Sequence, residues 1–244
     1  MEALILAAGY ATRLGELTAN RAKPLLPVGN KPIIDYIFGQ MAAMPEIKRV
    51  SVVTNQKFAA QFADWAAGHG GAKPISVVND LTTSDADKLG ASGDIRLVLE
   101  RNGIDDDLLI VAGDNLFDFP LREFVDFFHA HGTSMGLYDT GDLEIMTQYA
   151  VVQIDPGTQR VLDFVEKPAQ PKSTLAATAI YLWKRDHLPL LETYRDQGGN
   201  MDAPGHYHAW LTKQVDVYGF RLTGNWLDIG NRDQYDAACR AYAA

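Results

Sequence analysis

The sequence predicts an α/β protein built on a doubly wound, mostly parallel but mixed sheet, and three observations predict this class. In the first 133 residues, short apolar runs alternate with segments of helical periodicity, as in a parallel sheet covered on both faces. After residue 134, strand-like runs outnumber helices, so the sheet is expected to become mixed. The first apolar run ends at Gly9, which fits the tight turn after a buried strand.

Four strands are expected in the first half, because four short apolar runs are bounded by turn-forming residues. They span residues 3–8, 50–54, 74–78 and 108–112. Helices are expected between and after these strands. The first opens at Pro32, the second is ended by Gly68, the third is stopped by Gly103, and the fourth carries Leu121, Phe124, Val125 and Phe128.

The second half is expected to add further strands and three helices. The strand-like runs are 134–140, 148–155, 160–168, 175–183, 215–221 and the short 225–230. The helical segments are 186–195, 204–213 and 231–242. No internal repeat or long linker separates the halves, so residues 1–244 are expected to form a single domain, with 1–133 and 134–244 as its two interleaved halves.

Composition excludes several classes of protein. The chain has 244 residues, a net charge of −9 and a single cysteine, Cys239. An acidic chain is a poor partner for duplex nucleic acid, and no run approaches the roughly 18 to 20 apolar residues of a membrane span. One cysteine excludes an internal disulfide framework and favours a reducing, cytoplasmic compartment. An acidic protein that binds a polyphosphate must therefore use a few placed cations or a metal.

The N-terminal stretch gathers such cations. A buried strand followed by a glycine turn presents backbone N–H groups at the carboxyl end of a sheet, where they can cradle phosphate oxygens. Thr12 adds a hydroxyl, Arg13 a fork of donors and Lys23 a point charge. The glycine pattern is neither the dinucleotide fingerprint nor the P-loop. Taken alone, it fits a structural turn beside surface basic residues equally well.

Two aspartates follow apolar runs far apart in the chain. Asp114 comes directly after the 108–112 run and Gly113, and Asp228 lies in the apolar context WLDIG. An unpaired buried carboxylate is costly. If the fold brings them together, the two offer hard oxygen ligands suited to Mg²⁺. Asp114 taken alone is equally well explained as a turn residue at a strand end.

Seven short motifs, in order, resemble those of the sugar-1-phosphate nucleotidylyltransferases, and of the glucose-1-phosphate thymidylyltransferase type in particular. They are AAGYATRL, AKPLLPVGNKPII, LGASGDIRL, VAGDN, YAVV, VEKP and NWLDIG, spanning residues 3 to about 238. The resemblance implies a Rossmann-like nucleotidyltransferase fold, Mg²⁺, and nucleotide-sugar synthesis from a nucleoside triphosphate and a sugar 1-phosphate. Because the chain ends at Ala244, we expect no C-terminal β-helix of the kind that some relatives append. The oligomeric state is left open, with a homo-oligomer as one possibility.

The same resemblance implies roles for individual residues. Arg13 and Lys23 would be catalytic, Arg13 on the departing pyrophosphate and Lys23 near the α-phosphate. Asp114 and Asp228 would hold the metal. The expected nucleotide-binding residues are Ala8, Gly9, Thr12, Arg13, Lys23 and Gly90. The expected substrate-binding residues are Asn115, Tyr149, Ala150, Glu166 and Lys167. Residues 1–133 would thus bind mainly the nucleotide, and 134–244 mainly the sugar phosphate.

Three departures from the family pattern bear on specificity. Ala11 replaces a frequent glycine, so its φ is expected to be negative. Ala150 replaces the glycine of the YGVV element, and its methyl group is expected to narrow the sugar pocket. The segment DKLGASG lacks the glutamine-bearing pattern of thymidylyl transfer, so the identity of the nucleobase in the triphosphate is left open.

Three other functions remain as alternatives. They are a cytidylyltransferase acting on a phosphate such as phosphocholine, a nucleotide-sugar-dependent glycosyltransferase, and a silent sensor of nucleotide sugars. A sensor is expected to lose one of the five charged residues of the motifs, and all are present: Arg13, Lys23, Asp114, Lys167 and Asp228.

Some conspicuous polar residues have simpler explanations. The run 105–107 (DDD) precedes a strand, so it is expected to be a solvated loop at the other end of the sheet. His206 and His208 are poorly spaced for a shared metal on a helix and are expected at the surface or in packing. Residues 202–205 fit either an acceptor loop or a plain start of a helix.

Overall fold

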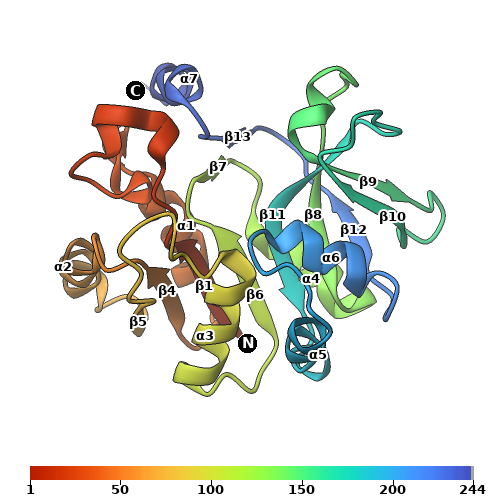
Figure 1. Cartoon of the computed structure of the whole chain (residues 1–244), viewed down its shortest axis with the longest axis horizontal. Helices are drawn as coiled ribbons and strands as arrows, with labels where there is room; N and C mark the ends of the chain where they lie inside the picture. Colours follow the sequence, from red (N-terminus) through yellow and green to blue (C-terminus); the bar gives the residue numbers. More distant parts are fainter. Residues whose placement is uncertain (243–244) are drawn as a thin grey trace.

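A computed structural model, which describes residues 1–242, shows a central nine-stranded sheet with helices on both faces (Figure 1). Strand β1 (Glu2–Ala7) lies between β4 (Val50–Thr54) and β6 (Leu108–Ala112), and β5 (Ile75–Asn79) flanks β4. These four strands are parallel, so their carboxyl ends meet at one edge of the sheet. The parallel first half predicted from the sequence is therefore confirmed.

The second half makes the sheet mixed, also as predicted. Strand β11 (Leu175–Trp183) joins antiparallel to β6 and also pairs with β8 (Ser134–Asp139) and β9 (Ala150–Ile154). Strand β10 (Val161–Glu166) is antiparallel to β9, whereas β12 (Tyr218–Arg221) is parallel to β8. The strand order through the main path is β10-β9-β11-β6-β1-β4-β5.

Two sets of helices bury two apolar cores against the sheet. The first set packs side chains such as Ile37, Phe62 and Phe124 on one face, and the second packs side chains such as Val98 and Leu211 on the other. The first set is α1 (Ile33–Ala43), α2 (Ala59–His69) and α4 (Leu121–His131). The second set is α3 (Ala91–Asn102), α5 (Leu190–Asp196) and α6 (Pro204–Leu211). Among residues 1–242, every helix is too short or too polar to span a bilayer.

Most boundaries fall close to those predicted, and the reasons are local. Gly103 ends α3 in the left-handed conformation (φ 57°), which glycine adopts without steric cost. The segment predicted as one helix over 186–195 is instead a 3₁₀ turn, Arg185–His187, followed by α5. Pro189 lies between the two, where its missing N–H limits continuous helical hydrogen bonding.

Small additional elements lie outside the nine-stranded sheet. Strand β7 (Asn115–Phe117) pairs antiparallel with β13 (Trp226–Asp228), and α7 (Arg232–Ala241) follows β13. A second small pair, β2 (Pro27–Val28) with β3 (Lys31–Pro32), lies before α1. Short 3₁₀ segments occupy Thr12–Thr18, which is kinked at Gly15, and Lys23–Leu25 and Ile145–Gln148. The β7–β13 register places Asp228 opposite Asn115, so Asp228 lies beside the Asp114 that precedes it.

The acidic run 105–107 and His208, which have simpler sequence explanations, take structural roles. Asp105 and Asp106 form surface ion pairs, with Arg185 (2.6 Å) and Lys48 (2.7 Å) respectively, at the amino end of β6. His208 is buried and bonded to the Trp183 indole N–H (3.1 Å) and to the Pro204 carbonyl (2.8 Å). Its role is packing, as expected.

Candidate active site

Two adjoining cavities lie at the carboxyl ends of the parallel strands. The N-terminal cavity, of about 460 Å³, is formed mainly by the end of β1, the loop after it and the start of α3. The C-terminal cavity, of about 260 Å³, is formed mainly by residues 148–234. The two share five lining residues, Arg13, Lys23, Asp114, Ala179 and Pro204. Two ligands placed in them would therefore meet at the same charged groups.

The loop after β1 forms one wall of the N-terminal cavity. A Cβ atom at Gly9 would meet no protein atom within 4 Å, so the backbone is open to a ligand there. The buried Asn55 anchors the loop, because its side-chain amide donates to the Ala8 carbonyl (2.8 Å). Thr12 and Arg13 are exposed at the cavity, and no ion pair neutralises Arg13 within residues 1–242. A free guanidinium beside open backbone N–H groups is a site for an anion.

Ala11 corrects one expectation from the sequence. Its φ is +50°, so the prediction of a negative φ was wrong. The turn into the 3₁₀ helix needs a left-handed residue at this position, at a cost of about 1–2 kcal/mol for alanine. The conformation is fixed locally, because the Ala11 carbonyl accepts from the Thr18 hydroxyl (2.9 Å) and the Leu14 N–H (3.0 Å).

Lys23 and Asp114 form an ion pair on the boundary between the cavities. The Lys23 ammonium also donates to the Ile229 carbonyl (2.7 Å). Asp114 is placed by Gly113, where an added Cβ would approach the Leu6 carbonyl to 2.9 Å and Pro24 to 3.0 Å. A side chain at this position would crowd β1 and the Lys23–Leu25 turn, so glycine lets the chain pass close to both before Asp114.

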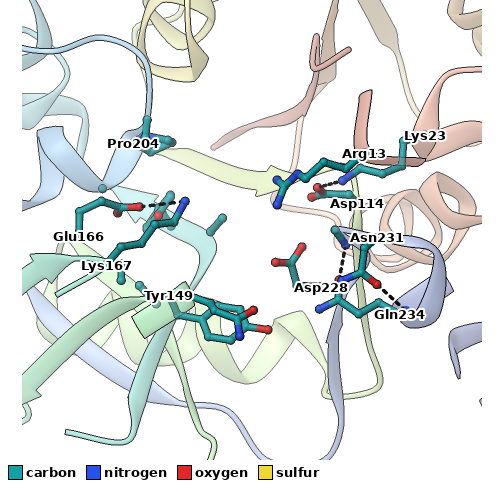
Figure 2. A pocket seen from close by; sticks show the side chains of 18 residues that line it. Arg13, Lys23, Asp114, Tyr149, Glu166, Lys167, Pro204, Asp228, Asn231 and Gln234 are labelled. Atoms are coloured by element: carbon teal, nitrogen blue, oxygen red, sulfur yellow. Dashed lines mark hydrogen bonds and ion pairs between the residues drawn. The ribbon is translucent and has the colours of Figure 1, made fainter. Parts of the chain in front are cut away.

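Asp228 completes the charged centre. Figure 2 shows its carboxylate between the Lys23–Asp114 pair and the Glu166–Lys167 pair. Burial, followed by the neighbouring Asp114 carboxylate, raises the pKa of Asp228 to about 6, although Lys23, Arg13 and Lys167 act in the opposite direction. Two carboxylates that repel each other in a half-buried cavity form a site that favours a cation.

The C-terminal cavity carries the second pair of charges. Lys167 has φ +44°, and its N–H donates to the Tyr149 carbonyl (3.2 Å), which fixes the turn after β10. Its ammonium lies 3.9 Å from Glu166, so this ion pair is loose. A Cβ on Gly205 would overlap the Glu166 carboxylate, so glycine there leaves room for it at the start of α6. Tyr149 and Ala150 line the same cavity.

Two expected site residues are not among the residues that line either cavity. Asn115 is buried, and its side chain is occupied: it donates to the Thr178 carbonyl (2.7 Å) and accepts from the Trp226 indole (3.1 Å). Gly90 precedes α3 with φ +77°, and an added Cβ would lie 2.4 Å from Asp202 Cα. Both residues make packing or hydrogen-bond contacts behind the residues that line the two cavities.

Several lining residues were missed by the sequence reasoning. Asn231 accepts from the Gln234 N–H (3.0 Å), and Gln234 accepts from the Gly230 N–H (2.8 Å), in the manner of a capping box at α7. The sequence NRDQ carries that signal and could have located this wall. No sequence signal marks Ala179, whose φ of +56° breaks the register of β11. Of residues 202–205, for which two explanations remained open, the last three line the C-terminal cavity, and α6 begins at the second of these, Pro204.

The fold and the site together define an α/β protein with two adjoining cavities that share one set of charged groups. The sequence profile described as nucleotidyl transferase matches residues 2–244, and the chain belongs to this family. The match confirms the membership that the sequence motifs predicted.

Named relatives and solved structures are consistent with this membership. The chain is 27% identical to the bifunctional protein GlmU of Methanocaldococcus jannaschii, covering 94% of this chain and 51% of that protein. It is 28% identical to a mannose-1-phosphate guanyltransferase of Candida albicans, covering 98% of this chain and 64% of that protein. It therefore spans about half to two thirds of these relatives. The structure of a UDP-glucose pyrophosphorylase complexed with UDP-glucose superposes with a TM-score of 0.81 at 20% identity, covering 99% of this chain and 97% of that one, which supports the fold.

Proposed function

We propose that this chain transfers a nucleotidyl group from a nucleoside triphosphate to a sugar 1-phosphate, releasing pyrophosphate and a nucleotide sugar. The observation that carries the proposal is the sharing of Arg13, Lys23 and Asp114 by the two cavities. A transfer between two phosphorylated substrates needs this arrangement, because both phosphates must meet where their charge is neutralised.

The triphosphate is assigned to the N-terminal cavity and the sugar phosphate to the C-terminal cavity. The open backbone at Gly9, with Thr12 and the unpaired Arg13, supports the first assignment. Lys167 and the carboxylate of Glu166, an acceptor for sugar hydroxyls, support the second. Residues 1–133 thus supply mainly the nucleotide side and residues 134–242 mainly the acceptor side.

The reaction needs no protein nucleophile. An oxygen of the sugar 1-phosphate attacks the α-phosphorus, the new P–O bond forms, and the bond to the β-phosphate breaks with pyrophosphate leaving. Lys23 sits where it can hold an α-phosphate oxygen, and Arg13 where it can hold the departing pyrophosphate. Lys167 orients the attacking phosphate. Each cation acts through its position and its charge. The stabilisation that it provides is therefore greatest in the transition state, where charge is redistributed.

The charged centre also fits a divalent cation, for which Mg²⁺ is the candidate. Asp114 and Asp228 supply hard carboxylate oxygens in one cavity, and the pKa of Asp228 is raised first by burial and then by the neighbouring Asp114 carboxylate, both of which a bound cation would offset. Residues 1–242 hold no cluster of three or more metal-ligating side chains, which leaves coordination positions for phosphate oxygens and water. When bound, the cation would neutralise charge on the triphosphate.

The relatives support the same class of substrates without fixing either one. Their names include a mannose-1-phosphate guanyltransferase and a UDP-glucose pyrophosphorylase, which act with different bases and sugars. A cytoplasmic location fits the single cysteine.

The test is a matrix of ATP, GTP, CTP, UTP and dTTP against several sugar 1-phosphates and phosphocholine, with pyrophosphate release as the readout. Release with at least one sugar 1-phosphate is the expected result. Release with phosphocholine alone would show that the acceptor is phosphocholine and not a sugar 1-phosphate. Transfer from a nucleotide sugar without pyrophosphate chemistry would indicate a glycosyltransferase, and binding without turnover a sensor.

A further inference from the structure

A groove of about 210 Å³ lies outside the two cavities of the active site. It is formed by β9, β10 and the segment that follows β10. Its lining combines apolar side chains, Val165 among them, with two glutamines and one residue of each charge, Asp163 and Lys172. None of its lining residues lines either active-site cavity, so the proposed reaction does not account for this groove.

Strand β10 leaves one of its faces open. It stands at the end of the strand order, and α6 packs against its other face (Figure 1). Phe164 marks the face covered by α6, because its ring stacks on His208 with the ring centroids 6.1 Å apart. Side chains alternate along a strand, so Asp163 and Val165 lie on the opposite face. Val165 is 40% exposed there.

A β-bulge adds a second exposed apolar side chain beside the groove. The pairing of β10 with β9 shifts by one residue between Val161 and Asp163, so Leu162 is the extra residue. Regular alternation would bury Leu162 beside Phe164, yet its side chain is 63% exposed, more than any other large apolar side chain in residues 1–242. Exposed apolar side chains beside a groove at a sheet edge are typical of a surface that binds another protein chain.

The charges of the groove indicate what that chain must carry. Within residues 1–242, neither Asp163 nor Lys172 forms an ion pair or a side-chain hydrogen bond, whereas the nearby Arg160 pairs with Asp216 at 2.9 Å. The other lining residues are uncharged. A partner that complements this groove must therefore present one charge of each sign.

A second copy of this chain presents that pattern. A two-fold axis midway between Asp163 and Lys172 exchanges their positions, so the acid of each copy faces the base of the other. The glutamine amides both donate and accept hydrogen bonds, so they are self-complementary as well. The chain has a net charge of −9, so two copies repel each other unless they meet through a surface whose own charges balance.

We propose that the face formed by β9, β10 and residues 168–172 is the interface of a two-fold dimer of this chain. Leu162 and Val165 pack across it, and Asp163 pairs with the partner's Lys172. The bulge and the charges oppose continued pairing of edge strands, so the contact closes on itself as a dimer and does not extend into a fibre. Dimerisation is measured without substrate, so the proposal stands or fails independently of the proposed function.

The first test is the mass of the chain in solution, measured by sedimentation velocity and light scattering at micromolar concentrations. The wild-type chain is expected to be a dimer. Lys172→Glu and Asp163→Lys each place like charges opposite one another in both symmetric contacts, so each is expected to weaken dimerisation about tenfold or more. The double variant, Asp163→Lys with Lys172→Glu, restores both pairs and is expected to recover the dimer.

A matched pair of apolar substitutions tests the other part of the interface. Leu162→Asp is expected to weaken the dimer, whereas Leu81→Asp is expected to leave it intact. Leu81 is 58% exposed and follows β5, at the opposite end of the strand order. Circular dichroism checks the fold of each variant. A monomeric wild-type chain would overturn the proposal, as would a dimer that all these substitutions leave unchanged or a double variant that stays as weak as the single ones.

The second test locates the interface in the wild-type chain. Isotopically labelled and unlabelled chains are mixed and treated with a carbodiimide, which joins a carboxylate to an amine that contacts it, and the products are digested and identified by mass spectrometry. A cross-link between Asp163 and Lys172 that combines a labelled with an unlabelled peptide is expected, because only a contact between two copies gives the mixed species. A dimer whose mixed cross-links all lie elsewhere would overturn the assignment of this face.

Discussion

The ammonium group of Lys23 bridges the Asp114 carboxylate and the Ile229 carbonyl, the latter at 2.7 Å. This contact joins three distant segments: the loop after β1, the end of β6 and the residue after β13. An ammonium has three N–H donors, so one remains for a phosphate oxygen. Lys23 is therefore held in place before substrate binds, which is the condition for charge stabilisation without reorganisation.

Lys23→Ala is expected to lower kcat by two or more orders of magnitude, because it removes a charge contact made in the transition state. Lys23→Arg is expected to restore little of the lost kcat, because a planar guanidinium cannot reproduce both hydrogen bonds that the ammonium makes. Steady-state kinetics with circular dichroism as a folding check measure this. Lys213→Ala, at an exposed position outside both cavities, is the control, and an unchanged kcat in folded Lys23→Ala would contradict the assignment.

Lys167→Ala is expected to raise the KM of the sugar 1-phosphate much more than the KM of the triphosphate. Lys167 lines only the C-terminal cavity, whereas Arg13 lines both. The two constants are measured by varying one substrate at saturating levels of the other. If only the KM of the triphosphate rises, the two phosphate sites have been assigned the wrong way round.

Ala150→Gly is expected to broaden the range of sugars accepted. Ala150 lines the C-terminal cavity beside Tyr149, so removing its methyl group enlarges the space for the acceptor. The measurement is kcat/KM across a panel of sugar 1-phosphates of increasing bulk. An unaltered profile would show that the methyl group does not limit the pocket.

The sequence predicted the sheet well because the sheet follows from local chemistry. Apolar runs ended by glycine mark the strands, and residues at the carboxyl ends of parallel strands must meet at one edge. Asp114 and Asp228 were expected to open on one cleft as the ends of two strands of the wound sheet. They do line one cavity, but Asp228 reaches it through the antiparallel β7–β13 pair, which lies outside the main sheet. Ala11 was predicted wrongly because steric preference disfavours a left-handed alanine, whereas the bonds to Thr18 and Leu14 enforce it.

Other parts of the site could not be predicted from the sequence, because they depend on tertiary packing. Asn115 directly follows Asp114 in the sequence, yet its amide is occupied by Thr178 and Trp226 from distant strands. The pairing of Asp94, which is buried in the first turn of α3, with Asp80 depends on how α3 packs against the end of β5. Neither the spacing of these two aspartates nor their residue type distinguishes them from ordinary surface acids.

Asp114→Asn and Asp228→Asn are each expected to abolish most activity while leaving the fold intact. Their effects should be far from additive, because either substitution disables the same cation site. Activity should vanish with EDTA and return with Mg²⁺. Kinetics of the two single variants and the double variant measure this, with Asp126→Asn, at an exposed position of α4, as the control. Full activity in EDTA, or additive losses, would contradict a shared cation.

Asp94 is expected to make stability fall as pH rises, and Asp94→Asn to remove that dependence. Burial, followed by the charge and hydrogen bond of Asp80, raises the pKa of Asp94 to about 8 in the folded chain, above 3.8 for an ordinary aspartate. Between these values the unfolded chain has released this proton while the folded chain keeps it, so ionisation favours unfolding. The slope is at most about 1.4 kcal/mol per pH unit. Below about pH 4 both states are protonated, and above about pH 8 both are ionised, so the loss of stability is confined to that window.

The Asn variant cannot ionise and keeps the bond to Asp80. The melting temperature of the wild-type chain, minus that of Asp94→Asn, should therefore become steadily more negative from pH 4 to 8 in the absence of ligand. A difference that stays constant over that range would show that Asp94 is already ionised in the folded protein.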